Sequence, residues 1–138
     1  MMPVSVPPAD EVTEGWWQGT REHRLLVQAC DHCGETQHPP RAVCIHCHRV
    51  DGLGWRETTG LGSVDSFTVV HRGPRPDLEV PYVVARVRLE AGPILLSRLE
   101  GRDASDEAWT IGDRVAATWV DLDDGRAIPV FVPEVSGG

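Results

Sequence analysis

The sequence predicts a mainly β protein with a helical N-terminal segment and a metal-binding ribbon. Two observations lead to this fold class: a double Cys-x-x-Cys motif in the first half, and short apolar runs between turn residues from Leu53 onward. Short strands with such spacing are typical of a β-sandwich or a small barrel. The length of 138 residues and the 41% hydrophobic composition suit one compact domain with a small appendage.

Residues 1–24 are expected to form a proline-rich lead followed by a short helix. Asp10 is a candidate N-cap, and glutamates follow in the first turn, where carboxylates stabilise the helix dipole. Val12 and Trp16 are four residues apart and define an apolar face. Two glycines lower the helix propensity by ~1 kcal/mol each, so this helix needs a packing partner.

The strand prediction depends on apolar alternation and on turn residues. It is clearest in Tyr82–Leu89, where the odd-numbered residues are all apolar. Glu90–Pro93 is a tight connection, so the next run is expected to pair with this strand as a hairpin. The expected strands are Leu25–Ala29, Leu53–Trp55, Ser63–Val70, Pro81–Leu89, Pro93–Leu99, Val115–Val120 and Ile128–Val132.

The strongest functional signal is the double motif formed by Cys30, Cys33, Cys44 and Cys47. Each Cys-x-x-Cys turn points two thiolates at one centre, and four thiolates at ~2.3 Å satisfy tetrahedral zinc. Because four cysteines leave no position open for water, the expected Zn²⁺ is structural rather than catalytic. The alternatives are two disulfides, iron, or redox chemistry of a Cys-x-x-Cys pair. Gly34 follows the first pair, where such a turn favours a residue without Cβ.

Five histidines have possible functional roles. His32, His46 and His48 surround the cysteine motifs, either as alternative ligands or, in the simpler interpretation, as solvent-facing residues of the turns. His38 and His71 could act as general bases, but no partnered nucleophile is evident in the sequence. No residue is therefore assigned a catalytic role.

Two further groups are candidates for binding. Trp16 and Trp17 are adjacent and cannot both face one side of a helix, so they are candidates for a partner interface, with core packing as the alternative. Arg41, Arg72 and Arg75 are candidates for binding the phosphates of a nucleotide-bearing cofactor, with surface solvation as the alternative.

The bulk properties disfavour some partners. A net charge of −8 and a pI near 5.1 disfavour nucleic acid, because an acidic surface repels phosphate backbones. No apolar run approaches the ~20 residues of a membrane span, and the N-terminus lacks the basic and apolar regions of a signal peptide. A cytoplasmic location is expected, where cysteines persist as thiolates rather than disulfides.

A set of short motifs occurs in a recognisable order over residues 11–133. The motifs are Trp16-Trp17, Leu25–Cys30, Cys33-Gly34, Pro39–Arg41, Cys44-x-x-Cys47, Gly60–Val64, Thr68–Arg72, Pro81–Val84, Ile111–Val115 and Pro129–Phe131. In combination they resemble the acyl-CoA-associated family once catalogued as domain of unknown function number 35. Two positions depart from the family pattern: Ile45, where proline is common, and His48, where glycine is common.

The resemblance implies a rubredoxin-like zinc ribbon over residues 25–56 and a C-terminal five-stranded OB-fold barrel over residues 57–133. The helical segment would occupy residues 1–24 and a disordered tail residues 134–138. Members of this family accompany thiolase-superfamily enzymes, as separate subunits or as fusions to hydratase-like domains. They are linked to thiolase, synthase and steroid side-chain retro-aldol chemistry, for which the partner carries the catalytic residues.

Three functional hypotheses follow. The first is a non-catalytic accessory subunit that binds a thiolase-like CoA-dependent enzyme and helps to receive the acyl-CoA, with the three arginines named above as candidate CoA ligands. The second is a single-stranded nucleic-acid-binding module that uses Phe67 and Tyr82, which the net charge opposes. The third is an independent CoA hydrolase.

Overall fold

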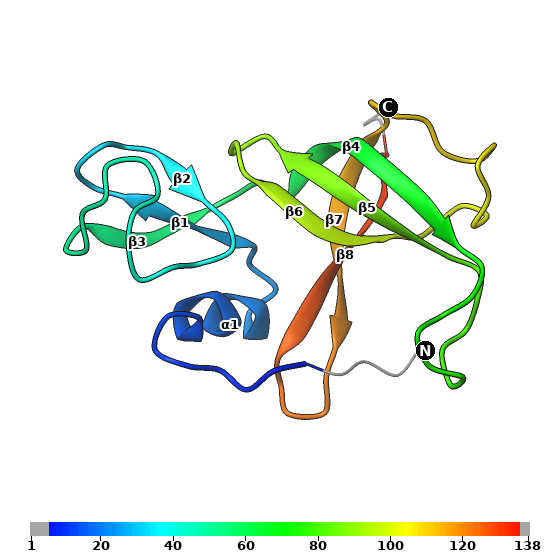
Figure 1. The fold of residues 1–138 in the computed structure, drawn as a ribbon, viewed down its shortest axis with the longest axis horizontal. Coiled ribbons are helices and arrows are strands. Elements are labelled where there is room, and N and C mark those ends of the chain that lie inside the picture. Colours follow the sequence, from blue (N-terminus) through cyan, green and yellow to red (C-terminus); the bar gives the residue numbers. More distant parts are fainter. Residues whose placement is uncertain (1–5, 136–138) are drawn as a thin grey trace.

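The computed structural model describes residues 6–135, and these contain one helix and eight strands. A three-stranded ribbon lies beside a closed barrel, and the helix packs beside both (Figure 1). The elements are α1 (Glu14–Arg21), β1 (Leu26–Cys30), β2 (Thr36–Gln37), β3 (Leu53–Glu57), β4 (Leu61–Val70), β5 (Tyr82–Leu89), β6 (Ile94–Leu99), β7 (Arg114–Asp121) and β8 (Ala127–Pro133). Within the described residues, no helix is long and apolar enough to cross a bilayer.

The ribbon is an antiparallel sheet with the strand order β2-β1-β3. Gln28 near the middle of β1 pairs with Gln37 of β2 on one side and with Trp55 of β3 on the other. The central strand ends at Cys30. It therefore delivers the first cysteine directly to the turn that follows.

The second sheet closes on itself in the order β4-β5-β6-β8-β7, with β4 paired to β7 through Leu61 and Ala116. Neighbouring strands are antiparallel except β6 and β8, which meet in parallel at Leu99 and Phe131. Five strands closed in this way form an OB-fold. This topology decides between the sandwich and the barrel that the strand spacing predicts, and it confirms the fold implied by the resemblance.

The alternation predicted for Tyr82–Leu89 is confirmed. In β5 the odd-numbered residues are buried, whereas the even-numbered residues face outward. The predicted hairpin is confirmed as well, because β5 and β6 are antiparallel and the N–H of Leu89 donates to the carbonyl of Pro93 at 3.0 Å.

One hydrophobic core joins the ribbon to the barrel. Phe131 of β8 is fully buried in this core, and Leu25 and Val27 enter it from the ribbon side. The other buried members are Val64, Val83, Ala85, Val87, Leu89, Leu95, Leu99, Trp109 and Val115. The two modules are therefore packed as one unit, and the expected chain boundary between residues 56 and 57 stays a prediction.

Helix α1 begins at Glu14, one turn later than a cap at Asp10 predicts. The Asp10 carboxylate accepts hydrogen bonds from the N–H groups of Val12 and Thr13 at 3.0 and 2.9 Å. Asp10 therefore caps the turn that leads into the helix rather than the helix itself. The inner face also differs from the prediction, because Trp17 is the buried tryptophan.

The two glycines of α1 allow the helix to pack closely against the ribbon. Because glycine lowers helix propensity, the helix needs this packing to be stable. A Cβ at Gly15 would lie 2.1 Å from the Nε1 atom of Trp55, and a Cβ at Gly19 would lie 2.8 Å from the side chain of Leu26. Their absent side chains let α1 lie directly against β3 and β1. This contact is the packing partner that the sequence analysis expects.

The opposite side of α1 is attached to the β7–β8 hairpin. The Thr20 hydroxyl accepts a hydrogen bond from the N–H of Ala127 at 3.2 Å. The disordered tail was expected to begin at Glu134, but this residue is attached to the barrel. Its N–H donates to the carbonyl of Arg114 at 3.0 Å. The remainder of that tail, residues 136–138, and residues 1–5 of the lead lie outside the described residues.

Candidate metal centre and adjoining cleft

The first Cys-x-x-Cys turn is closed by two backbone hydrogen bonds. The N–H of Cys30 donates to the carbonyl of Glu35 at 3.0 Å, and the N–H of Gly34 donates to the carbonyl of Cys30 at 2.8 Å. Gly34 has a φ of +77°, a left-handed conformation that glycine adopts without steric cost. The left-handed φ agrees with the predicted preference for a residue without Cβ at this position.

The second turn repeats this backbone geometry. The N–H of Cys44 donates to the carbonyl of Arg49 at 2.9 Å, and the N–H of His48 donates to the carbonyl of Cys44 at 2.8 Å. His48 is the counterpart of Gly34 and has a φ of +66°. A non-glycine residue in this conformation costs ~1–2 kcal/mol, although histidine tolerates it better than most.

We expect the substitution His48→Gly to raise the free energy of unfolding by about 0.5–1 kcal/mol, because it removes this strain. Gly34→Ala provides the matched test in the first turn, where an added Cβ meets no atom within 4 Å. It should lower stability by about 1 kcal/mol through the backbone alone. Urea titration at saturating zinc measures both. Equal stability of His48→Gly and the parent would show that the second turn is unstrained.

The two turns bring four sulfur atoms together. The Sγ atoms of Cys30 and Cys47 are 3.7 Å apart, and those of Cys33 and Cys44 are 3.6 Å apart. All four lie within 4.8 Å of one another. A disulfide requires ~2.05 Å, whereas a tetrahedron with metal–sulfur bonds of ~2.3 Å has sulfur–sulfur edges of ~3.8 Å. The donor set and its spacing therefore fit tetrahedral zinc.

Neighbouring groups act on the ionisation of these thiols. The backbone N–H groups of Cys47 and His46 lower the pKa of Cys44 to about 6. The N–H of Glu35 acts to lower the pKa of Cys33, but partial desolvation and the three neighbouring sulfurs outweigh it and raise this pKa to about 12. Four sulfurs this close cannot all ionise unless a cation offsets their mutual repulsion.

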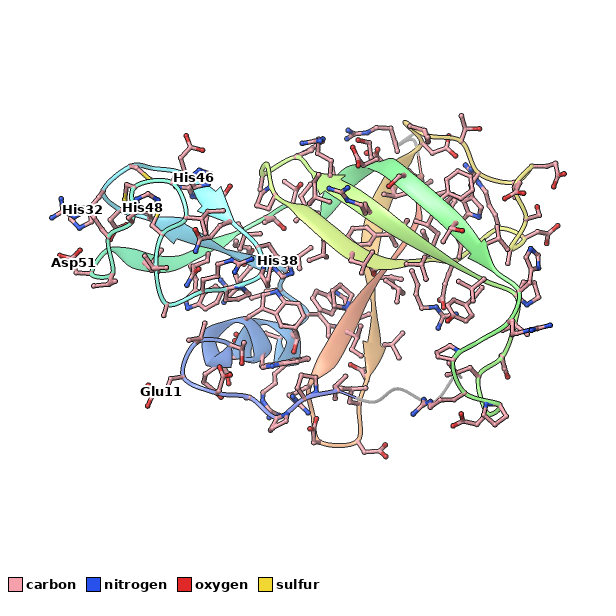
Figure 2. All side chains as sticks on the ribbon, in the orientation of Figure 1. Glu11, His32, His38, His46, His48 and Asp51 are labelled. Atoms are coloured by element: carbon pink, nitrogen blue, oxygen red, sulfur yellow. The ribbon has the colours of Figure 1, made fainter. Side chains whose placement is uncertain are left out.

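The three histidines near the motifs lie around the cysteine cluster without joining it (Figure 2). The Nε2 atom of His32 lies 3.1 Å from the carboxylate of Asp51, and the Nε2 atom of His46 lies 3.2 Å from the carbonyl of Thr36. His48, like the other two, is exposed. This geometry favours the solvent-facing interpretation over a role as alternative ligands.

Two buried glutamines, Gln28 and Gln37, hold the second turn and the loop before it through hydrogen bonds. The Gln37 amide donates to the side-chain carbonyl of Gln28 at 2.6 Å and to the carbonyl of Val43 at 3.1 Å, while it accepts from the N–H of Ile45 at 2.9 Å. Gln28 in turn binds both the N–H and the carbonyl of Arg41, at 2.9 and 2.8 Å. This pair was not predicted from the sequence; the available signal was two glutamines in short strands that flank the first motif.

The adjacent tryptophans have different environments. Trp17 is buried, with the guanidinium of Arg126 4.4 Å from its ring centre. The half-buried ring of Trp16 lies edge-on to Trp17 at 4.7 Å and 6.0 Å from the ring of His38. Trp16 therefore links the helix to the loop after β2. Core packing accounts for Trp17, and the partner-interface role of these tryptophans stays a prediction.

The protein should become less stable as the pH decreases, because the buried imidazole of His38 resists protonation in the folded state. Burial lowers the pKa of this imidazole from 6.5 to about 4. The unfolded chain binds a proton below pH 6.5 while the folded chain stays neutral, so stability is full above pH 6.5 and declines toward pH 4. His38→Gln should remove about 2 kcal/mol of the decline between pH 7.5 and pH 5. Urea titrations at pH 7.5 and pH 5 measure it, with His71→Gln as the exposed control. An identical decline in both variants would contradict the prediction.

The candidate anion-binding arginines lie in different parts of the molecule. Arg41 is exposed in the loop that follows β2, whereas Arg72 and Arg75 belong to the loop between β4 and β5, at the barrel end away from the ribbon (Figure 1). Arg75 forms an ion pair with Asp77 at 3.4 Å. The structure does not bring the three arginines into one site, and their role in CoA binding stays a prediction.

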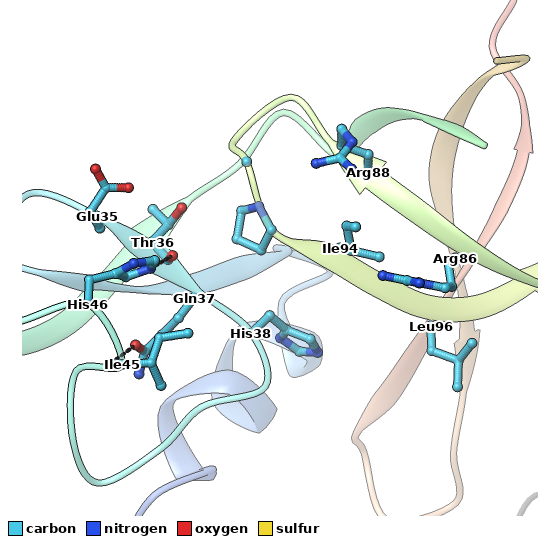
Figure 3. A pocket seen from close by; sticks show the side chains of 12 residues that line it. Glu35, Thr36, Gln37, His38, Ile45, His46, Arg86, Arg88, Ile94 and Leu96 are labelled. Carbon is cyan, nitrogen blue, oxygen red and sulfur yellow. Dashed lines mark hydrogen bonds between the residues drawn. The ribbon is translucent and has the colours of Figure 1, made fainter. Parts of the chain in front are cut away.

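A cleft of about 610 Å³ lies between the ribbon and the β5–β6 hairpin (Figure 3). From the ribbon, His38, Ile45 and His46 line it. From the hairpin, the wall includes Arg86 and Leu96. This cleft was not predicted from the sequence, since it depends on how the two modules are packed.

Four converging cysteines on a ribbon that shares its core with an OB-fold barrel define a zinc-ribbon and OB-fold protein. Family comparison agrees: the rubredoxin-like zinc ribbon domain of ChsH2 matches residues 17–53, and the C-terminal OB-fold domain of ChsH2 matches residues 55–130. The chain belongs to this family, which the resemblance named in the sequence analysis as domain of unknown function number 35 (DUF35).

Two curated relatives are much longer than this chain. The probable enoyl-CoA hydratase alpha subunit of Thermomonospora curvata is 37% identical over 122 residues, which cover 87% of this chain and 37% of that protein. The 3-oxo-4,17-pregnadiene-20-carboxyl-CoA hydratase alpha subunit of Mycobacterium tuberculosis is 34% identical over 118 residues, which cover 86% of this chain and 37% of that protein. The chain thus spans just over a third of their length.

Other similar proteins match along most of their length. A DUF35 domain-containing scaffold protein of Methanocaldococcus jannaschii is 31% identical over 124 residues, which cover 84% of this chain and 85% of that protein. Among solved structures, a chain of the Ltp2-ChsH2(DUF35) aldolase matches with a TM-score of 0.83 and 34% identity, over 94% of this chain and 100% of that chain.

Proposed function

We propose that this chain is a non-catalytic accessory subunit of a thiolase-superfamily enzyme. The observation that carries the proposal is the match of both modules to ChsH2, extended by the similarity along 94% of this chain to a chain of the Ltp2-ChsH2(DUF35) aldolase. Relatives described as scaffold proteins and as enzyme subunits support the same role.

The metal in this proposal is one Zn²⁺ bound by Cys30, Cys33, Cys44 and Cys47. Bound there, it would be a structural cross-link, because four sulfur ligands fill its tetrahedral shell and leave no position for water or substrate. The fit of the sulfur spacing to a zinc tetrahedron supports this assignment.

The polar contacts of the described residues support a non-catalytic role. Within residues 6–135, three of the six histidines bind a carboxylate or a backbone carbonyl: His23 with Asp121, His32 with Asp51, and His46 with the carbonyl of Thr36. None of these contacts pairs a base with a hydroxyl or thiol nucleophile, as covalent catalysis requires. The reacting groups would therefore belong to the partner, and the substrate would be an acyl-CoA, the class named in two relatives.

The test is co-expression of this chain with a thiolase-superfamily protein from the same genome, followed by measurement of the mass of the purified complex. We expect a hetero-oligomer, and we expect retro-aldol or thiolytic turnover of acyl-CoA to fall when this chain is omitted. The chain alone should show no turnover. If this chain remains monomeric beside that protein, and the protein is fully active alone, the proposed function is wrong.

A further inference from the structure

The outer face of the β5–β6 hairpin carries a repeated pairing of cation and apolar side chain. Each of three cross-strand pairs on this face joins one arginine to one apolar residue. The pairs are Val84 with Arg98, Arg86 with Leu96, and Arg88 with Ile94. The apolar residues on the inner face of both strands belong instead to the core.

Apolar side chains that border the cleft are exposed to solvent, both on the outer face of the β5–β6 hairpin and on the ribbon. Leu96 is 71% exposed, and Ile45 is 49% exposed on the facing ribbon wall (Figure 3). Exposed apolar groups that are rimmed by charged residues mark interaction sites. Since isoleucine and leucine contribute to this cleft from two separate modules, the apolar surface spans the junction between them.

The cleft is less acidic than the chain as a whole. Arg86 and Arg88 share a single carboxylate, Asp65, at 3.9 and 3.3 Å, and each side chain remains 55% exposed. Among the cleft-lining residues, Glu35 is the acidic one. The chain as a whole carries a net charge of −8. Arginine forks pair well with carboxylates, so this surface is complementary to an apolar segment that carries acidic groups.

The exposure of the apolar walls favours a polypeptide over a small molecule. Small-molecule sites bury ~70–90% of their ligand between apolar walls, whereas Leu96 and Ile45 lie open at the rim. The two walls are also held together, because the Thr36 hydroxyl on the ribbon donates to the carbonyl of Ala91 at 3.1 Å and Leu25 belongs to the shared core. A preformed surface lowers the ordering cost of association.

We propose that the cleft between the ribbon and the β5–β6 hairpin is the docking surface for the partner enzyme. The partner contributes a segment that presents apolar side chains to Leu96 and Ile45 and carboxylates to Arg86 and Arg88. This inference depends on the proposed function, because it names the surface through which that function operates.

The experiment measures binding of Leu96→Gln and Arg86→Gln variants of the full chain to the thiolase-superfamily protein used in the co-expression test. We expect Leu96→Gln to raise the dissociation constant of the complex at least tenfold. Arg86→Gln should raise the dissociation constant severalfold and reduce the dependence of binding on salt. The control is Ile111→Gln, because Ile111 is 65% exposed but does not line the cleft. It should change affinity less than twofold, and unchanged melting verifies the fold of each variant.

Different outcomes separate this inference from the proposed function. If the parent chain binds and both cleft variants bind equally well, the docking surface is wrong and the proposed function stands. If the parent chain does not bind at all, both are wrong. Octanoyl-CoA serves as a second probe with the isolated chain. If Leu96→Gln abolishes octanoyl-CoA binding but leaves the complex intact, the cleft is a ligand site and the docking proposal is overturned.

Discussion

Removal of the metal is expected to unfold the ribbon while the barrel stays folded. In small zinc domains, metal binding contributes an apparent ~10–16 kcal/mol, which is the largest single term available to the ribbon. Besides the metal, the hydrogen bonds of Gln28 and Gln37 are the main contacts that hold the second Cys-x-x-Cys turn. The buried apolar side chains of the ribbon, Leu25, Val27 and Ala29, all precede the first turn, and the buried Cys30 and Cys44 are themselves metal ligands in the proposed function.

The barrel is expected to survive because its core does not depend on the metal. Phe131 and most of the buried apolar residues belong to β4–β8 or to the connection that carries Trp109. Leu25 and Val27 are the ribbon-side members, so loss of the ribbon removes only these two from the core. The barrel should therefore lose stability without losing its fold.

Amide hydrogen exchange after treatment with a strong chelator measures this prediction. Protection should disappear over residues 26–57 and persist over residues 83–99 and 115–131, while elemental analysis verifies that the metal is gone. Chelator with excess zinc is the control, and Cys30→Ser should reproduce the loss without chelator. Unchanged protection in protein that is verified to be metal-free would contradict both the prediction and the assignment of the four cysteines.

Local patterns in the sequence were sufficient to predict the parts of the site that depend on local geometry. The Cys-x-x-Cys spacing predicts two equivalent turns, and the closeness of the four sulfurs agrees with it. Gly34 was predictable because a left-handed residue is needed at one defined place in the turn. The alternation in Tyr82–Leu89 predicted a half-buried strand because one face of that strand meets the core.

Features that depend on contacts between distant segments were not predictable in this way. Trp55 lies in an expected strand, but the pattern within that strand does not indicate that its side chain is 37% exposed and lies against Gly15 of the helix. Nothing near Leu25 in the sequence indicates that the ribbon shares a core with the barrel. The cleft beside Leu96 likewise arises only when both modules are in place. Each of these three features depends on how separate elements pack together rather than on the residue pattern within a single element.

The second large effect is expected from Gln37→Leu. The substitution keeps the approximate size of the side chain but removes all of its hydrogen bonds, leaving the N–H of Ile45 and the carbonyl of Val43 without their side-chain partner. Each buried group left unpaired costs ~1–3 kcal/mol, and because Val43 and Ile45 are partly exposed, the free energy of unfolding should fall by about 2 kcal/mol. Because Ile45 lies between Cys44 and Cys47, the same change loosens the second turn.

Zinc affinity is expected to fall ~10–100-fold in this variant, the range found when groups that orient metal ligands are removed. Competition with a chromophoric zinc chelator measures the affinity, and urea titration measures the stability. Gln18→Leu is the matched control, because it makes the same chemical change at an exposed position of α1 and should alter stability by less than ~0.5 kcal/mol. If Gln37→Leu keeps the parent affinity, the metal alone determines the geometry of the second turn, and the buried amides serve only the packing of the loop from Pro39 to Val43 against β1.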